Sequence, residues 1–342
     1  MAAETAIEWT DATWNPIRGC TRLSPGCGGG TPGDLKGGCY AERVAARFSG
    51  PGQAYEGLAE MRNGAARWTG KLRLVEEALT QPLRWKRPRR IFVNSMSDLF
   101  HEVLTDEQID RVFAVMALAP QHTFQVLTKR SARMRAYMTD TSQRRSDGLG
   151  TAVVALDPTM PLECLRWPLP NVWLGVSAED QTRADERVPD LLATPAATRF
   201  VSAEPLLGPI DFGLHRVDGI AVDPLCDDCG ERHEGACDAL DWIIVGGESG
   251  PGARPMHPHW ARDIRDACAA AGVAFFHKQN GAWAALKESE GEWPVDADGF
   301  IRLGYDGTRH ATGWPMQRVG KKFAGRLLDG VTHDAMPEVR HG

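Results

Sequence analysis

The sequence predicts an α/β fold built on a parallel sheet, as a partial or full TIM-like (β/α) barrel, and three observations support this. Short apolar runs recur along the chain, and most of them are separated by stretches with helical spacing. Several runs are continuously apolar, as expected for strands that are covered on both faces. A polar cluster follows nearly every run, where active sites assemble in parallel α/β proteins.

Seven strands are expected, at residues 7–14, 90–94, 123–127, 172–176, 199–201, 242–245 and 273–276. Helical patterns lie between most of them. Thr105 and Gln108 have the spacing of a capping box and precede apolar residues at helical intervals, at 109, 112, 113 and 116. Residues 179–193 and 259–271 are also expected to be helices, the second ended by Gly272.

Two segments interrupt this rhythm and are expected to be insertions into a barrel of residues 1–280. Residues 139–171 are rich in Ser, Asp, Pro and Arg, which predicts a loop. Residues 211–239 carry a group of cysteines and are expected to form a small separate knob. For residues 281–342 we expect a C-terminal cap of hairpins with a final short helix.

Composition and charge exclude several classes of protein. The chain has 342 residues, of which 42% are hydrophobic and 25% charged, so it can bury a sizeable core and is not wholly disordered. Its net charge of -6 excludes a broadly basic nucleic-acid-binding coat, although not a local basic groove. Because no long apolar run and no signal-peptide layout are visible, we expect a cytoplasmic protein without membrane contact.

Six of the eight cysteines fall into two groups of three, and in a reducing compartment such groups are more often metal ligands than disulfides. Cys20, Cys27 and Cys39 follow the first strand, and residues 1–100 contain no fourth Cys or His. Three thiolates favour a 4Fe–4S cluster with one open iron. A zinc ion completed by a distant ligand such as His101, or three buried thiols without metal, are the alternatives.

The second group favours a structural zinc site. Cys226, Cys229, His233 and Cys237 lie within twelve residues and form a Cys3His set. Zn²⁺ would stabilise a segment that is too small to have its own core. The two lone cysteines, Cys164 and Cys268, are expected to be small buried residues.

Six stretches of the chain carry a resemblance to a known family. Residues 7–16 (IEWTDATWNP), Gly19-Cys20 and residues 39–42 (CYAE) resemble the three-Cys-motif family of uncharacterised phage and bacterial proteins, and residues 172–177, 202–208 and 243–250 are similar to its later motifs. More distantly, the chain resembles radical S-adenosylmethionine (SAM) enzymes of the spore photoproduct lyase branch. The correspondence lies in the three cysteines, in Ser97-Asp98 after the second strand and in Thr128-Lys129 after the third.

This resemblance implies a barrel of radical-SAM type that holds a 4Fe–4S cluster and cleaves SAM to a 5′-deoxyadenosyl radical. Cys20, Cys27 and Cys39 would then bind iron. Tyr40 would pack on the adenine or the cluster. Ser95, Ser97 and Asp98, which follow the second strand, would contact the SAM amino group or ribose. Three charged residues would contact the SAM carboxylate, the ribose or the substrate: Lys129, Glu204 and Glu248.

The cysteine spacing departs from both patterns. The radical-SAM superfamily usually has three and then two intervening residues, and the phage family has six and then two. Six residues separate Cys20 from Cys27 here, and eleven separate Cys27 from Cys39. The longer loop contains six glycines, and loop closure costs only about 0.6 kcal/mol more per doubling of length.

The resemblance also suggests partners and a substrate class. It implies an electron donor, and it suggests a nucleic-acid base or nucleotide as substrate. The basic residues at 84–90, which flank Trp85, agree with phosphate contacts, although a solvated face explains them equally well.

Two other functions are a non-enzymatic metal-binding phage protein with two structural metal sites, and a barrel hydrolase with a divalent metal at Asp98, His101, Glu204 and His277.

Overall fold

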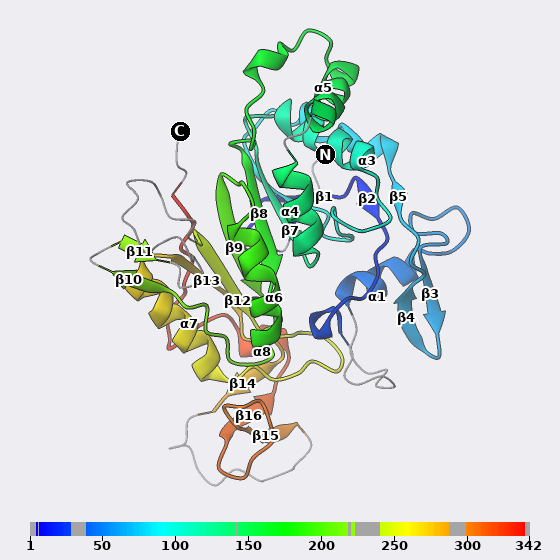
Figure 1. Cartoon of the computed structure of the whole chain (residues 1–342). Coiled ribbons are helices and arrows are strands. Elements are labelled where there is room, and N and C mark those ends of the chain that lie inside the picture. Colours follow the sequence, from blue (N-terminus) through cyan, green and yellow to red (C-terminus); the bar gives the residue numbers. More distant parts are fainter. Residues whose placement is uncertain are drawn as a thin grey trace.

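The structure is a computed structural model that describes residues 5, 7–28, 39–140, 143–217, 220–222, 240–286 and 299–338, with the backbone alone described at 143–146, 215–217 and 220–222. Its centre is a seven-stranded parallel sheet that curls into a half-barrel (Figure 1). The strands, in their order across the sheet, are β1 (Ala12–Trp14), β6 (Arg90–Val93), β7 (Thr123–Thr128), β8 (Val172–Ser177), β9 (Thr198–Ala203), β12 (Trp242–Gly246) and β13 (Ala274–Gln279). This order follows the chain without reversal, which confirms the predicted α/β class with parallel strands.

The first predicted strand is shorter than expected, because only its last three residues pair with β6. The residues before it turn, and Trp9 packs among aromatic side chains of the sheet, with its ring centroid 4.8 Å from that of Phe92 and 6.0 Å from that of Trp242. Tertiary packing of one large side chain therefore makes the strand begin later than predicted.

The two faces of the sheet have different cores. Alternate residues of β8 illustrate this: Val172, Leu174 and Val176 join the core beneath the helices, whereas Trp173 joins a second, aromatic cluster. That cluster consists of Trp9, Phe92, Trp173, Phe200, Trp242, Ile244 and Phe276. Gly175 is needed between them, since a Cβ there would lie 2.5 Å from the Phe200 ring. Because strand side chains alternate in direction and the helices pack on the larger core, the aromatic cluster lies on the face opposite the helices.

The helices confirm the predicted spacing. In α3 (Asp106–Ala117), Thr105 and Gln108 form the capping box expected from the sequence. The other two predicted helices are α6 (Gln181–Leu192) and α7 (Pro258–Ala271), and Gly272 ends α7 in a left-handed conformation with φ of 73°. A further helix, α4 (Ser131–Thr139), follows β7.

The expectation of a loop at residues 139–171 is wrong in part. This segment contains α5 (Gln143–Leu156), which packs against α3, and the short 3₁₀ helix η3 (Leu162–Cys164). The cause is a buried stripe at helical spacing, formed by Leu149, Ala152 and Val153, which the polar composition of the segment conceals. Cys164, expected to be buried, is exposed, whereas Cys268 is buried as expected.

The second insertion is described only at its start, where β10 (His215–Val217) and β11 (Ile220–Val222) form an antiparallel hairpin. The proposed zinc ligands Cys226, Cys229, His233 and Cys237 lie outside the described residues. Zinc binding at this segment therefore stays a prediction.

Smaller elements flank the sheet at both ends of the chain. Before β6 lie β2 (Ile17–Arg18), η1 (Pro25–Cys27), α1 (Tyr40–Arg47), β3 (Ala59–Arg62), β4 (Ala65–Trp68), β5 (Arg73–Leu74), α2 (Glu76–Leu79) and η2 (Pro82–Arg84). After β13, β14 (Trp283–Ala285), β15 (Phe300–Leu303) and β16 (Trp314–Arg318) form an antiparallel sheet in the order β14-β16-β15, followed by α8 (Lys321–Ala324). The division into a barrel and a cap stays a prediction. Within the described ranges, no helix is both long and apolar enough to cross a membrane.

Candidate functional site

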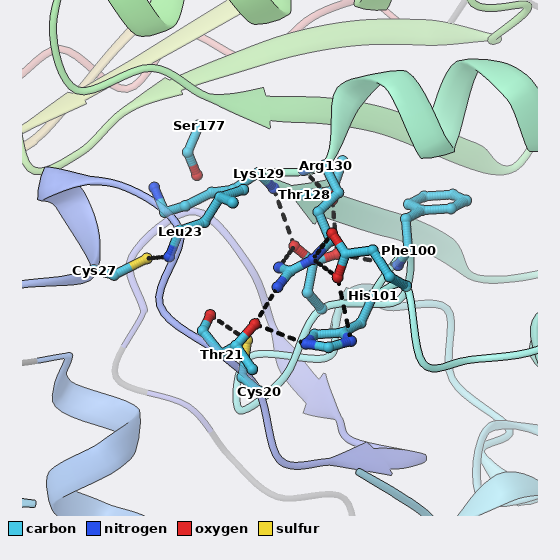
Figure 2. Close-up of polar contacts among 12 residues, drawn as sticks. Cys20, Thr21, Leu23, Cys27, Phe100, His101, Thr128, Lys129, Arg130 and Ser177 are labelled. Carbon is cyan, nitrogen blue, oxygen red and sulfur yellow. Dashed lines mark hydrogen bonds and ion pairs between the residues drawn. The ribbon is translucent and has the colours of Figure 1, made fainter. Parts of the chain in front are cut away.

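The predicted polar residues lie at one edge of the sheet, because the carboxyl ends of parallel strands share an edge. Asp98 follows β6, Lys129 follows β7, Glu204 follows β9 and Glu248 follows β12. The segment from Cys20 to Cys27 also reaches this edge, as its contacts with the strand ends show (Figure 2). We call residues 20–27 the cysteine loop.

Asp98 is buried and its carboxylate is fully engaged by the protein. Its Oδ1 accepts hydrogen bonds from Thr128 Oγ1 at 2.7 Å and from the Phe100 N–H at 3.0 Å. Its Oδ2 accepts from Arg130 Nη1 at 3.0 Å and from the Lys129 N–H at 3.1 Å. Asp98 therefore ties the end of β6 to the end of β7, and Arg130 is its charge partner.

Arg130 joins this pair to the cysteine loop (Figure 2). Its Nη2 donates to Thr21 Oγ1 at 2.7 Å, and its Nε contacts both carboxylate oxygens of Glu102 at 2.9 Å. Thr21 Oγ1 also lies 2.9 Å from His101 Nε2. Burial, followed by the charge of Arg130, lowers the pKa of His101, so this imidazole is neutral near pH 7. The residue next to Cys20 is thus fixed by two buried side chains.

Glu179 holds the middle of the cysteine loop, and the sequence analysis did not single it out as a site residue. Its side chain is inaccessible to solvent, and its Oε1 accepts from the Gly26 N–H at 2.8 Å. Its Oε2 lies 3.4 Å from Lys129 Nζ and 3.2 Å from Arg187 Nη1. Burial alone would raise the pKa of Glu179, but Lys129, the Gly26 N–H and Arg187 lower it to about 2. Glu179 is therefore ionised at all physiological pH values.

Two more arginines, one of them within the loop, connect the cysteine loop to other parts of the protein. Arg254 contacts both carboxylate oxygens of Glu248, at 2.7 and 2.9 Å, and donates to the Pro25 carbonyl oxygen at 3.0 Å. Arg22 contacts the buried carboxylate of Glu42 on α1 at 2.6 Å and donates to the Gly28 carbonyl oxygen at 2.7 Å. The cysteine loop is thus anchored to the ends of β7, β8 and β12 and to α1.

The three thiols of the first cysteine group lie within electrostatic range of one another. Burial raises the pKa of Cys20 to about 12, and Asp98, Cys39 and Cys27 contribute to the rise. Burial also raises the pKa of Cys39, with a contribution from Cys27. Among the residues that the structure describes, however, no three His, Cys, Asp or Glu side chains are grouped closely enough to hold a metal ion.

Glu204 forms an ion pair across β12 with a residue that the sequence analysis did not assign. Lys278 Nζ on β13 lies 2.7 and 2.9 Å from the two carboxylate oxygens of Glu204. Gly246 makes room for this pair, because a Cβ there would lie 3.2 Å from the Glu204 carboxyl carbon. A Cβ at Gly247 would lie 2.5 Å from the Asn280 carbonyl oxygen. Both glycines are therefore required by packing within the protein.

Tyr40 and the serines after β6 lie along the same edge. Tyr40 opens α1 directly after Cys39, and its hydroxyl donates to the Ser95 carbonyl oxygen. Its side chain is 51% exposed, and burial of the hydroxyl group, with smaller effects from Cys39 and Glu204, raises its pKa. Ser95 Oγ donates to Asn15 Oδ1 at 3.1 Å, and Ser97 Oγ donates to the Ile17 carbonyl oxygen at 2.9 Å.

Two groups of predicted residues are not gathered here. His277 is fully buried beneath the tail of the chain, and its Nε2 lies 2.9 Å from Asn280 Oδ1, so it does not join Asp98 and His101 in a divalent-metal site. The basic residues 84–90 precede β6 and lie at its amino end, whereas the cysteine loop contacts carboxyl ends. Arg90, at the end of that cluster, is paired with Asp11 at 2.8 Å.

A family model described as "Protein of unknown function (DUF5131)" matches residues 4–337. Neither the curated proteins nor the solved structures contain a significant match to the chain.

Proposed function

The chain belongs to the DUF5131 family, and from the chemistry at its strand ends we propose that it is an iron–sulfur enzyme of radical-SAM type. The main support is that Cys20 and Cys27 lie on a loop held at the carboxyl ends of the parallel strands. Cys39 directly precedes α1, whose Glu42 binds Arg22 of the same loop. The consecutive order of parallel strands supports the finer proposal of a TIM-like barrel of this type.

Three cysteine thiolates suit a 4Fe–4S cluster with one iron open to SAM. The sulfur atoms must approach one another for this, because they are not grouped at metal-binding positions within the described residues. When bound, the cluster would supply the electron that cleaves SAM to methionine and a 5′-deoxyadenosyl radical, which removes a hydrogen atom from the substrate.

The contacts around the cysteine loop define what the chain's own residues would do. Arg130, Glu179 and Arg254 hold the loop against the strand ends, so Cys20 and Cys27 would enter cluster assembly with little loss of conformational entropy. Tyr40 and Glu204 present accessible side-chain surface beside the thiols and are the best placed of the predicted residues to contact SAM or substrate.

The other predicted roles stay proposals. Lys129 would contact the SAM carboxylate or an anionic substrate while it remains paired with Glu179. Glu248 would contact the ribose or the substrate while it remains paired with Arg254. Ser95, Ser97 and Asp98 would shape the SAM site through the loop after β6. Zn²⁺ at the second cysteine group, an electron donor, a nucleotide-type substrate and a cytoplasmic location complete the proposal.

The test is the content of iron, sulfide and zinc in protein prepared and reconstituted without oxygen. We expect about four irons per chain and formation of 5′-deoxyadenosine from SAM after reduction. Cys20→Ala, Cys27→Ala and Cys39→Ala should each lose iron and SAM cleavage. Cys164→Ala is the matched control, because this exposed thiol lies in η3, away from the cysteine loop.

Two zinc ions and no iron in the wild-type protein would overturn the proposal and favour the alternative of a non-enzymatic metal-binding protein. Four irons that survive substitution of all three site cysteines would also overturn it, because the cluster would then be held elsewhere.

A further inference from the structure

Two arginines meet at one glycine beside the candidate site. Arg318 Nη2 donates to the Gly250 carbonyl oxygen at 3.2 Å. Arg43 Nη2 lies 2.8 Å from the position that a Cβ on Gly250 would occupy. Within the described part of the chain, neither guanidinium forms an ion pair, in contrast to Arg22 and Arg254, which are neutralised by Glu42 and Glu248.

The position of this arginine pair connects it to the cysteine loop. Arg43 lies on α1 three residues after Tyr40, so the two side chains occupy the same side of the helix. Gly250 lies in the loop after β12, two residues from Glu248, whose partner Arg254 contacts the cysteine loop. The pair therefore faces the same edge of the sheet as the three thiols.

The chemistry of the pair favours a phosphate group. Two like charges held at one residue repel each other, and a bound anion converts this repulsion into attraction. Planar guanidinium groups donate paired hydrogen bonds to phosphate oxygens. A phosphate monoester carries a charge of about −1.5 to −2 at pH 7 and can neutralise both arginines, whereas a carboxylate neutralises only one.

We propose that Arg43 and Arg318 form a binding site for a phosphate group of the substrate, which makes the substrate a phosphate ester. This inference uses the proposed function only to identify the ligand as substrate. Lys322 and Phe323 lie on α8, four and five residues after Arg318, and both are exposed, with Phe323 at 82%. A cation and an aromatic surface close in the chain to a phosphate-binding residue suit a nucleotide, either free or within a single strand.

Binding assays with defined probes test the site. Titration calorimetry with AMP, ribose 5-phosphate, inorganic phosphate, acetate and a short single-stranded oligonucleotide should show binding of the phosphate-bearing probes and none of acetate. Tighter binding of AMP than of ribose 5-phosphate would indicate that the substrate is a nucleotide. Still tighter binding of the oligonucleotide would indicate a nucleic-acid strand. Arg43→Gln with Arg318→Gln should weaken binding by at least about tenfold per guanidinium. The affinity of the double variant Arg43→Lys with Arg318→Lys should be intermediate, because this variant retains the charge but loses the planar guanidinium groups.

The matched control is Arg166→Gln with Arg309→Gln, which removes the same charge from two exposed residues, one after η3 and one between β15 and β16. It should leave binding of the phosphate probes unchanged. Loss of binding in this control with retention in the Arg43 and Arg318 variant would overturn the inference, as would absence of phosphate binding to the wild-type protein or equal binding of acetate.

Iron content measured on the same samples separates the two proposals. Phosphate binding that depends on Arg43 and Arg318, in protein that takes up no iron, supports the phosphate site and overturns the iron–sulfur proposal. Iron uptake and SAM cleavage without binding of any phosphate probe would support the iron–sulfur proposal and overturn the phosphate site.

Discussion

Replacement of Glu179 by Gln tests whether a buried carboxylate anchors the cysteine loop. Glu179 has no exposed side-chain surface and contacts Gly26, Lys129 and Arg187. Its pKa falls from 4.5 to about 2 on folding. At 1.36 kcal/mol per pKa unit, this difference corresponds to about 3 kcal/mol of stability. Removal of one partner of a buried ion pair costs a similar amount, about 3–5 kcal/mol.

The expected result for Glu179→Gln is a loss of about 3 kcal/mol in the free energy of unfolding at pH 7, measured by urea denaturation with tryptophan fluorescence. The sign of the pH dependence follows from the lowered pKa. The carboxylate stabilises the fold fully above pH 4.5, and this contribution disappears as pH falls towards 2. The difference between wild-type and variant should therefore shrink below pH 4.5.

Glu186→Gln is the matched control, because the Glu186 side chain is half-exposed and its ion pair with Arg183, at 3.5 Å, lies within the same helix. It should change stability by less than about 0.5 kcal/mol. A loss below about 1 kcal/mol for Glu179→Gln, or a difference from wild-type that stays constant between pH 7 and pH 3, would refute the assignment of Glu179 as an ionised anchor.

Three further predictions concern other parts of the fold, each measured by urea denaturation. Gly175→Ala should destabilise the protein by about 1–3 kcal/mol, because the new Cβ would lie 2.5 Å from the Phe200 ring. Gly208→Ala is the control, since the nearest atom to a Cβ on Gly208 would be 4.0 Å away; Gly52 is unsuitable because its φ is positive. Thr21→Val should cost about 1–3 kcal/mol by leaving Arg130 Nη2 without its acceptor, and Thr21→Ser should restore most of it. Burial lowers the pKa of His277 to about 4, so stability should fall by up to about 3 kcal/mol from pH 6.5 to pH 4, and His277→Gln should flatten this part of the profile. Equal stability of Gly175→Ala and wild-type, failure of Ser to rescue Thr21→Val, or an unchanged acid profile in His277→Gln would contradict the respective argument.

The candidate site shows where sequence patterns stop being informative. The positions of Asp98, Lys129, Glu204 and Glu248 after their strands were predictable, because a strand of known direction places its last residue at a known edge of the sheet. Their partners were not. Glu179 contacts Gly26 across 153 positions of sequence, and no local pattern encodes such a pair.

The sequence by itself determined the seven parallel strands, the capped helix α3, the presence of α6 and the end of α7 at Gly272, because periodicity, capping and glycine conformation act within a few residues. Only the tertiary structure decided that Trp9 shortens β1, that α5 packs on α3, and that Arg130, Glu179 and Arg254 hold the cysteine loop. These features depend on which side chains meet when the sheet curls. A buried charge is stable only beside a group of opposite charge, and such partners meet only when the whole chain is folded.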